Sequence, residues 1–162
     1  MGVDADRVRA ALSRWATGVT IVTARAGEEV HGMTVSDFAG LSLDPPLVLV
    51  CADKASNTLG VVEKGGCFAV NVLAAGQEAL SNKFASKKQE WERFDGLECA
   101  RAETGAPLIP GALVSIDCEV EATHEGGDHV ILVGRIREIV QREGDPLIYF
   151  SGAYRGLEPA GD

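Results

Sequence analysis

The chain has 162 residues, a length typical of a single domain, and its 24 acidic against 15 basic residues give a net charge of −9. This charge argues against nucleic acids and anionic membranes as partners, because those surfaces require a concentrated positive field. The sequence has no apolar run close to the roughly 18–20 residues of a membrane span and no secretory signal at its N-terminus, so we expect a cytoplasmic protein.

The first part of the chain predicts one helix followed by strands. Apolar residues at helical spacing predict an amphipathic helix over Asp4–Trp15, with acidic residues near its positive end. β-Branched residues predict strands at Val19–Arg25 and Val30–Ser36, joined by a short hairpin loop. Pro45-Pro46 forces an extended backbone before a largely apolar strand, Leu47–Ala52.

The middle of the chain predicts short helices around one strand. We expect helices at Asn57–Lys64 and Gln77–Ser86, and a strand at Cys67–Leu73 between them. A charged helical turn is expected at Gln89–Phe94, and a loop at Asp95–Pro110.

Two long strands dominate the last part, Leu113–Thr123 and His129–Val140, with a turn at Glu125–Asp128 and a short strand at Leu147–Phe150. In the first of them apolar residues alternate with polar ones such as Asp117, which predicts a half-buried strand with the polar residues outside. Consecutive strands joined by tight loops favour a mainly β, antiparallel sheet, with enough strands for a barrel. The glycine-rich motifs of common nucleotide-binding folds are missing from the sequence.

The segment Asp53–Thr58, between a strand and a predicted helix, is a candidate phosphate site. A helix N-terminus offers free N–H donors and about half a positive charge, and Lys54, Ser56 and Thr58 would add a cation and two hydroxyls. The alternative interpretation is structural: Ser56 or Asn57 is an N-cap and Lys54 is solvated.

Two further segments are candidates for ligand contacts. Small and hydroxyl side chains in Gly32–Phe38 would let a planar ring approach the backbone, although the segment also fits a strand that enters a turn. In Leu80–Ser86, Ser81, Asn82 and Lys83 would reach a ligand while their apolar neighbours pack, or the helix simply faces the core.

The cysteines and histidines indicate no metal site or nucleophilic dyad. Cys51, Cys67, Cys99 and Cys118 form no C-x-x-C pair and lie far from the histidines in sequence. Cys51 and Cys118 fit small buried thiols. His129 follows a Gly-Gly-Asp turn, where a solvated or structural histidine is the simple interpretation.

Eight segments in the same order together resemble the short-chain flavin reductase family, the reductase components of two-component flavin monooxygenases. These segments are Ala16–Thr23, Gly32–Phe38, Leu41–Val48, Asp53–Thr58, Phe68–Leu73, Leu80–Ala85, Gly105–Leu108 and Gly126–His129. They span about residues 10–155 of a single domain over 1–162. Each segment alone is weak evidence for this family, whereas eight segments in the same order are specific for it.

The resemblance implies a flavin-binding split β-barrel, a homodimer with the flavin near the subunit interface. The residues that it implies for the flavin ring are Met33, Thr34, Val35, Ser36, Asp37, Ser42, Cys51, Ala52 and Asp53. Those implied for the ribityl phosphate are Lys54, Ser56, Asn57 and Thr58, with Ser81, Asn82, Lys83, Phe84 and Ala85 closing over it. Many relatives carry a small residue where Asp37 stands, and an acid there would oppose the negative charge of reduced flavin.

The resemblance also implies the reaction: a hydride passes from C4 of NADH or NADPH to N5 of FMN or FAD, and the reduced flavin supplies a partner monooxygenase. His129 is expected on the nicotinamide side as the catalytic residue, and Tyr154 near the same pocket. Three alternatives remain open: a flavin-binding electron carrier of this fold, a related barrel that oxidises a B6 vitamer, and a non-enzymatic strand-rich dimer.

Overall fold

The computed structural model describes residues 2–161, which form mainly antiparallel strands and three short α-helices. The helices are α1 (Ala5–Leu12), α2 (Asn57–Gly65) and α3 (Glu78–Ala85), and a 3₁₀ turn covers Glu90–Glu92. The strands of the largest sheet are β2 (Thr20–Ala26), β3 (Glu29–Val35), β4 (Phe38–Leu43), β5 (Pro46–Asp53), β6 (Cys67–Val72), β9 (Val114–Gly126) and β10 (His129–Gln141). The short strands are β1 (Thr17–Gly18), β7 (Ala100–Arg101), β8 (Pro107–Leu108), β11 (Ile148–Phe150) and β12 (Ala153–Arg155). Between residues 2 and 161, no helix has the length and apolar character needed to cross a membrane.

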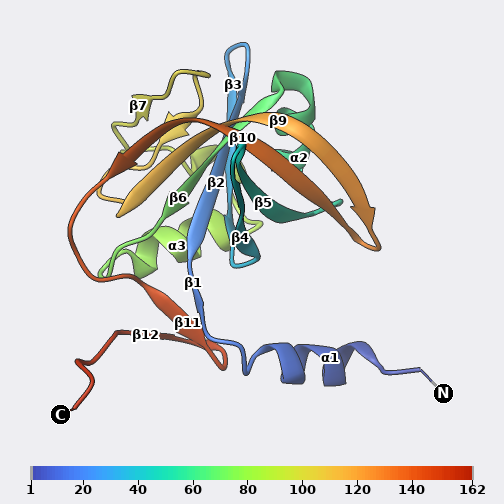
Figure 1. Ribbon diagram of the computed structural model, residues 1–162, viewed down its shortest axis with the longest axis vertical. Helices are drawn as coiled ribbons and strands as arrows, with labels where there is room; N and C mark the ends of the chain where they lie inside the picture. The colour runs from blue at the N-terminus through green and yellow to red at the C-terminus, as the bar shows by residue number, and fades with distance from the viewer. Residues whose placement is uncertain (1, 162) are drawn as a thin grey trace.

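The largest sheet has the strand order β3-β2-β6-β9-β10-β5-β4, and all neighbouring strands are antiparallel. Figure 1 shows the β9–β10 hairpin curving across the other strands. The two edge strands, β3 and β4, are consecutive in the chain, and Cys51 of β5 donates its N–H to the carbonyl oxygen of Asp37 between them, at 3.0 Å. The expected mainly β, antiparallel class is confirmed.

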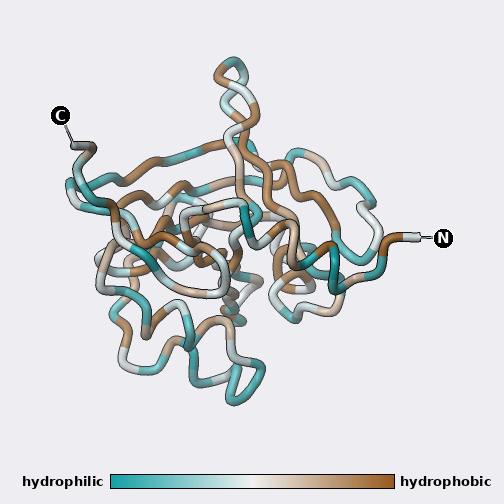
Figure 2. The backbone as a smooth tube through the Cα atoms, turned by 90° about the horizontal axis from the view of Figure 1, so that it is seen from below, coloured by the Kyte–Doolittle hydropathy of each residue, from teal (hydrophilic) through white to brown (hydrophobic). Residues whose placement is uncertain are grey.

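Two apolar cores hold the strands and helices together. In the first, Leu59 and Val62 of α2 pack against the inner face of the large sheet, around Phe68. The second joins Phe84 of α3 to Leu147 and to the start of β2. Each large side chain that is fully buried contributes roughly 1.5–3 kcal/mol. Figure 2 shows hydrophobic stretches along the central strands and hydrophilic ones in many of the loops around them.

The expected amphipathic helix at the N-terminus is a helix, but it has no buried face. It ends at Leu12, three residues before the predicted end at Trp15, and none of its residues is buried. The side chains of Leu12 and Trp15 are 68% and 76% exposed. Figure 1 shows α1 extending away from the large sheet, so this chain provides no surface for the apolar residues of the helix.

The strand β4 and the short pair β7–β8 were not predicted from the sequence. The strand β4 was missed because its small residues, Ala39, Gly40 and Ser42, have a low strand preference, and it forms by pairing with β5. The expected loop Asp95–Pro110 contains the short pair β7–β8. Pairing of this kind depends on a distant partner strand and leaves little local pattern.

The prediction that Asp117 lies on an exposed face of its strand is wrong. Asp117 is 1% exposed, because the loop around Thr104 covers that face at the start of β9. Its carboxylate accepts hydrogen bonds from the Thr104 backbone N–H (2.9 Å) and hydroxyl (2.6 Å). Burial raises the pKa of Asp117, while the two bonds from Thr104 oppose that rise.

Candidate functional site

A row of three pockets follows β3 from the N-terminal arm to the beginning of α2. We name them the Trp15 pocket (about 520 Å³), the Tyr154 pocket (about 270 Å³) and the Met33 pocket (about 200 Å³). Ser36 lines both of the first two, and Thr34 and Ala85 line both of the last two. Because neighbouring pockets share lining residues, the three lie side by side along β3, and together we call them the groove.

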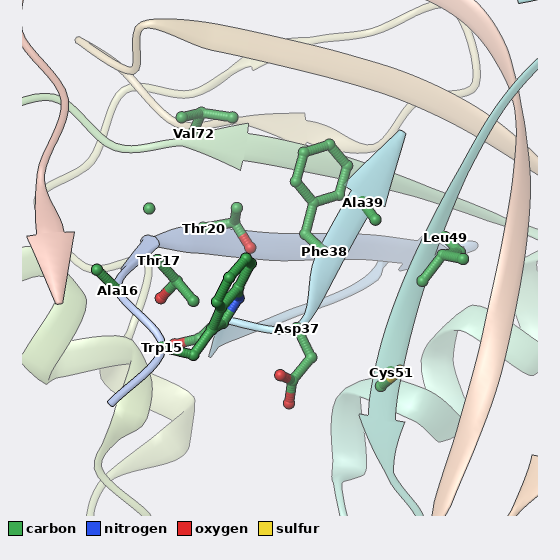
Figure 3. A pocket seen from close by; sticks show the side chains of 12 residues that line it. Trp15, Ala16, Thr17, Thr20, Asp37, Phe38, Ala39, Leu49, Cys51 and Val72 are labelled. Carbon is green, nitrogen blue, oxygen red and sulfur yellow. The ribbon is translucent and has the colours of Figure 1, made fainter. Parts of the chain in front are cut away.

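The Trp15 pocket lies between the N-terminal arm, the β3–β4 connection and β5. Figure 3 shows the Trp15 indole standing beside Thr20, with the Phe38 ring on the far side of the opening. The Asp37 carboxylate points away from Phe38 in this view. Cys51 forms part of the β5 wall, and burial, followed by the charge of Asp37, raises the pKa of its thiol. This end of the groove is therefore largely apolar.

In the Tyr154 pocket, residues distant in the sequence form a polar network. The Thr34 hydroxyl donates to the carbonyl oxygen of Ser81 at 2.6 Å. The Tyr154 hydroxyl oxygen lies 2.8 Å from Ser81 Oγ and 2.7 Å from Asn82 Oδ1. The ring of Tyr149 meets that of Tyr154 edge to face, at 5.5 Å between centroids. The structure thus brings together four of the predicted site residues from β3, α3 and β12.

The Met33 pocket opens at the N-terminus of α2. Ser56 is the N-cap of this helix: its Oγ accepts the N–H of Thr58 at 3.1 Å and lies 3.0 Å from the sulfur of Met33. The Asp53 carboxylate accepts the N–H of Ala55 at 2.8 Å, which folds the preceding turn. The helix therefore directs its free N–H groups and partial positive charge toward the groove.

Other predicted phosphate ligands have partners within the protein. Lys54, which follows β5, forms an ion pair with Glu125 near the end of β9. The Thr58 hydroxyl lies 2.6 Å from Nδ1 of His31, and Asn57 donates to Glu90 at 3.0 Å. The structural interpretation of Ser56 as an N-cap is confirmed, and Lys54 is ion-paired rather than solvated alone.

Six of the predicted flavin-binding residues lie outside the three pockets. These are Val35, Ser42, Ala52, Lys54, Thr58 and Lys83. Ala52 is fully buried, and Lys83 donates to the carbonyl oxygen of Asp95 at 2.9 Å. The Phe84 ring packs edge to face on Phe94, with centroids 5.1 Å apart. A Cβ at Gly32 would stand 2.8 Å from that ring, so a glycine is required for α3 to approach β3 this closely.

His129 begins β10, as predicted, and lies beside the candidate phosphate loop. It is paired across the strands with Asp53, and its Nδ1 lies 2.7 Å from the Asp128 carboxylate. The hydrogen bond from His129 lowers the pKa of Asp128. The imidazole is 37% exposed and lines none of the three pockets, so its relation to a nicotinamide stays a prediction.

Arg93, which was not predicted from the sequence, is buried and lines the Met33 pocket. Its guanidinium donates to the carbonyl oxygens of Gly32 (2.8 Å) and Ser86 (2.6 Å), and it lies 3.7 Å from Glu90. Its Nε is buried and has no partner among the residues described. Arg93 stands in a charge-rich segment and was not predicted, because its buried position depends on the carbonyl group of Gly32, which lies far away in the sequence.

The comparisons with known proteins agree with this architecture. Residues 12–158 match the model of the flavin reductase like domain. The chain is 39% identical over 158 residues to the reductase subunit HsaB of a flavin-dependent monooxygenase from Rhodococcus jostii, covering 97% of this chain and 80% of the relative. It is 40% identical over 153 residues to the FMN reductase (NADH) SmoA from Agrobacterium fabrum, covering 94% and 86%.

A solved structure shows the same fold. The NADH:FAD oxidoreductase SgcE6 of Streptomyces globisporus, in complex with NAD and FAD fragments, superposes with a TM-score of 0.90 at 36% identity, covering 100% of this chain and 99% of the other. The resemblance drawn from the eight sequence segments is thus confirmed by sequence and by structure. The chain belongs to the flavin reductase like domain family.

Proposed function

We propose that this protein is an NAD(P)H-dependent flavin reductase that binds FMN or FAD along the groove and delivers reduced flavin to a partner monooxygenase. The observation that supports this most strongly is the row of adjoining pockets along β3, which runs from an apolar end at Trp15 to the N-terminus of α2. FMN has a comparable arrangement along its length, with a planar aromatic ring at one end and a phosphate at the other.

The residues of the groove fit this group. Backbone and small side chains of Thr34 and Ser36 leave room for a ring, and the Ser81–Tyr154 network offers hydroxyls at its side. The N-terminus of α2 suits a phosphate, and Lys87 adds a cation to the Met33 pocket. The orphaned Nε of Arg93 adds an unsatisfied donor and positive potential beside it.

The bound flavin supplies the chemistry, accepting at N5 the hydride that leaves C4 of the nicotinamide. The protein's own residues bind, orient and exclude water. Ser56 fixes the start of α2 and thereby the direction of its N–H donors, and Tyr154 holds Ser81 and Asn82 against the groove. In this proposal His129 positions the nicotinamide nucleotide and transfers no proton, because hydride transfer requires no acid–base pair.

We include a homodimer in the proposal. The apolar side chains of the N-terminal arm, Leu12 and Trp15 among them, are exposed, and Trp15 forms a wall of the groove. A second copy of the chain packed on this arm would bury these side chains and close that end of the groove. The relatives named above support the reductase role, and they include both an FMN reductase and an NADH:FAD oxidoreductase.

The reductase proposal is tested with purified protein, flavin and NADH or NADPH. We expect NADH or NADPH absorbance to fall only when FMN or FAD is present. Tight co-purification of a flavin with slow oxidation of NADH and NADPH would favour the electron carrier. If neither dinucleotide is consumed in a flavin-dependent way, the reductase proposal is wrong.

The phosphate end is tested with the double substitution of Ser56→Ala and Lys87→Ala, which removes the N-cap hydroxyl of α2 and the cation of the Met33 pocket. It should weaken FMN binding much more than riboflavin binding, since only FMN carries the phosphate. Lys88→Ala, which removes an exposed lysine outside the groove, is the control for a general charge effect. Equal losses for FMN and riboflavin in the double variant would reject the site.

A further inference from the structure

A fourth pocket lies beyond the phosphate end of the groove, between α2 and the Glu90–Asp95 segment. We name it the Trp91 pocket; its volume is about 750 Å³, larger than each of the three pockets described above. It shares Ser56, Asn57 and Glu90 with the Met33 pocket. The Trp91 pocket therefore adjoins the groove at the N-terminus of α2 as a further chamber.

The position of this chamber restricts what it can hold. With a flavin phosphate at the N-terminus of α2, the Trp91 pocket lies on the side away from the ring. FMN ends at that phosphate, whereas FAD continues through a second phosphate to an adenosine. A chamber at this place suits the part of FAD that FMN lacks.

The walls of the Trp91 pocket have the chemistry that adenosine requires. Trp91 is 79% exposed and Phe94 lies in the same wall, so an aromatic face is available for a purine ring. Gly60 exposes bare helix backbone, and a Cβ there would meet nothing within 4 Å. Glu29 and Asp95 place carboxylates in the pocket, and such acceptors bind ribose hydroxyls.

The charged groups where the Trp91 pocket meets the Met33 pocket are compatible with a bound pyrophosphate. Glu90 is the acid there, and it accepts from Asn57 at 3.0 Å and lies 3.2 Å from Nε2 of His31 and 3.7 Å from Arg93. Its negative charge is therefore largely compensated within the protein. Lys64 lines the other side of the Trp91 pocket and forms an ion pair there with Glu29, at 3.5 Å.

We propose that the Trp91 pocket binds the adenosine half of FAD and makes this protein prefer FAD to FMN. The proposal rests on the proposed function, since it takes the flavin phosphate at α2 as its starting point. The acidic walls also disfavour a 2′-phosphate, so adenosine 5′-phosphate should bind there better than its 2′-phosphorylated form.

The test compares equilibrium binding of FAD and FMN by flavin fluorescence, without nicotinamide. Trp91→Ala should weaken FAD about tenfold, within the range for loss of one base–aromatic stack, and leave FMN unchanged. The matched control is Trp15→Ala, which removes an equally exposed indole at the opposite end of the groove and should leave the FAD-to-FMN ratio unchanged. An unchanged ratio in Trp91→Ala, or equal losses of both flavins, would overturn the proposal.

A second variant tests the same chamber by filling it. Gly60→Leu places a side chain where the structure leaves open space on α2, and it favours the helix, so the fold should be retained. We expect FAD affinity to fall by tenfold or more while FMN affinity stays constant. Retained FAD binding by Gly60→Leu contradicts the proposal.

The adenosine proposal and the reductase proposal fail in different ways. If the wild-type protein oxidises NADH with FMN and FAD equally well, and Trp91→Ala changes neither affinity, the reductase stands and the adenosine site falls. If adenosine 5′-phosphate quenches the fluorescence of Trp91 in a Trp15→Phe background but no flavin is reduced, the pocket stands and the reductase falls.

Discussion

Apolar side chains are buried in the large sheet of this protein but exposed on its N-terminal arm. In the sheet Ile21, Val50 and Phe68 have no exposed surface, whereas on the arm Leu12 and Trp15 are 68% and 76% exposed. Both regions show regular apolar spacing in the sequence. Figure 1 shows why the outcomes differ: the strands curve around a shared interior, and α1 projects away from it.

The difference teaches that apolar periodicity indicates a face to be buried but does not indicate which chain will bury it. Strands of the sheet find their partners within the chain, as β2 does in β3 and β6. The arm finds none here, and for that reason we assign its apolar face to the proposed subunit interface. The predictions below test this division, from the largest expected effect to the smallest.

Replacing a core side chain of the sheet should cause the largest loss of stability. Phe68→Ala removes a fully buried ring between β6 and β10 and should lower the free energy of unfolding by about 3–5 kcal/mol. Urea unfolding followed by circular dichroism measures it. Trp15→Ala should change the unfolding of dilute protein by less than about 0.5 kcal/mol, and a loss similar to that of Phe68→Ala would break the comparison.

Replacing Arg93, a buried polar residue that lines the Met33 pocket, should cause the next largest loss of stability. Arg93→Met leaves the carbonyl oxygens of Gly32 and Ser86 without their donor, at a cost of about 2 kcal/mol. Because Arg93 joins β3 to the end of α3, flavin affinity should fall as well. Arg101→Met, an exposed control, should leave the urea midpoint and the flavin affinity unchanged.

Charging the arm should weaken association with little effect on the fold. Leu12→Glu places a carboxylate on the exposed apolar face of α1 and should raise the dimer dissociation constant at least tenfold, about 1.4 kcal/mol. Sedimentation velocity at several concentrations measures it, with the far-ultraviolet spectrum as the check on folding. Arg14→Glu, an exposed change of charge on the same arm, should have a smaller effect. A wild-type protein that stays monomeric at high concentration would refute the homodimer.

The smallest expected effect is on the pH dependence of stability. Burial, with the nearby Arg93, lowers the pKa of His31 below its ordinary value of 6.5, and Glu90 opposes this. The unfolded chain therefore binds the proton more readily, and the contribution of His31 to stability is complete above pH 6.5 and is lost as pH falls through its folded pKa. His31→Gln should flatten the stability profile below pH 6.5, while His124→Gln on the exposed hairpin should not; identical slopes in all three proteins would contradict this assignment.

Most of the sheet could be predicted from the sequence, because β2, β5, β6, β9 and β10 carry dense apolar or alternating patterns. The strand β4 could not, since its small residues gain strand structure only from pairing with β5. The same limit applies to the site. The backbone segments of the groove were found, whereas the contacts that connect them across the fold, such as Arg93 with Gly32, depend on three-dimensional packing alone.

The central claim is that the groove along β3 binds a flavin and presents it to a nicotinamide. Anaerobic mixing of the protein, FAD and NADH, followed by absorbance in a stopped-flow instrument, tests this most directly. We expect the flavin band to bleach as NADH is consumed in equal amount, faster than without protein, and the rate to saturate with flavin. Bleaching at the rate of the protein-free mixture would contradict the account.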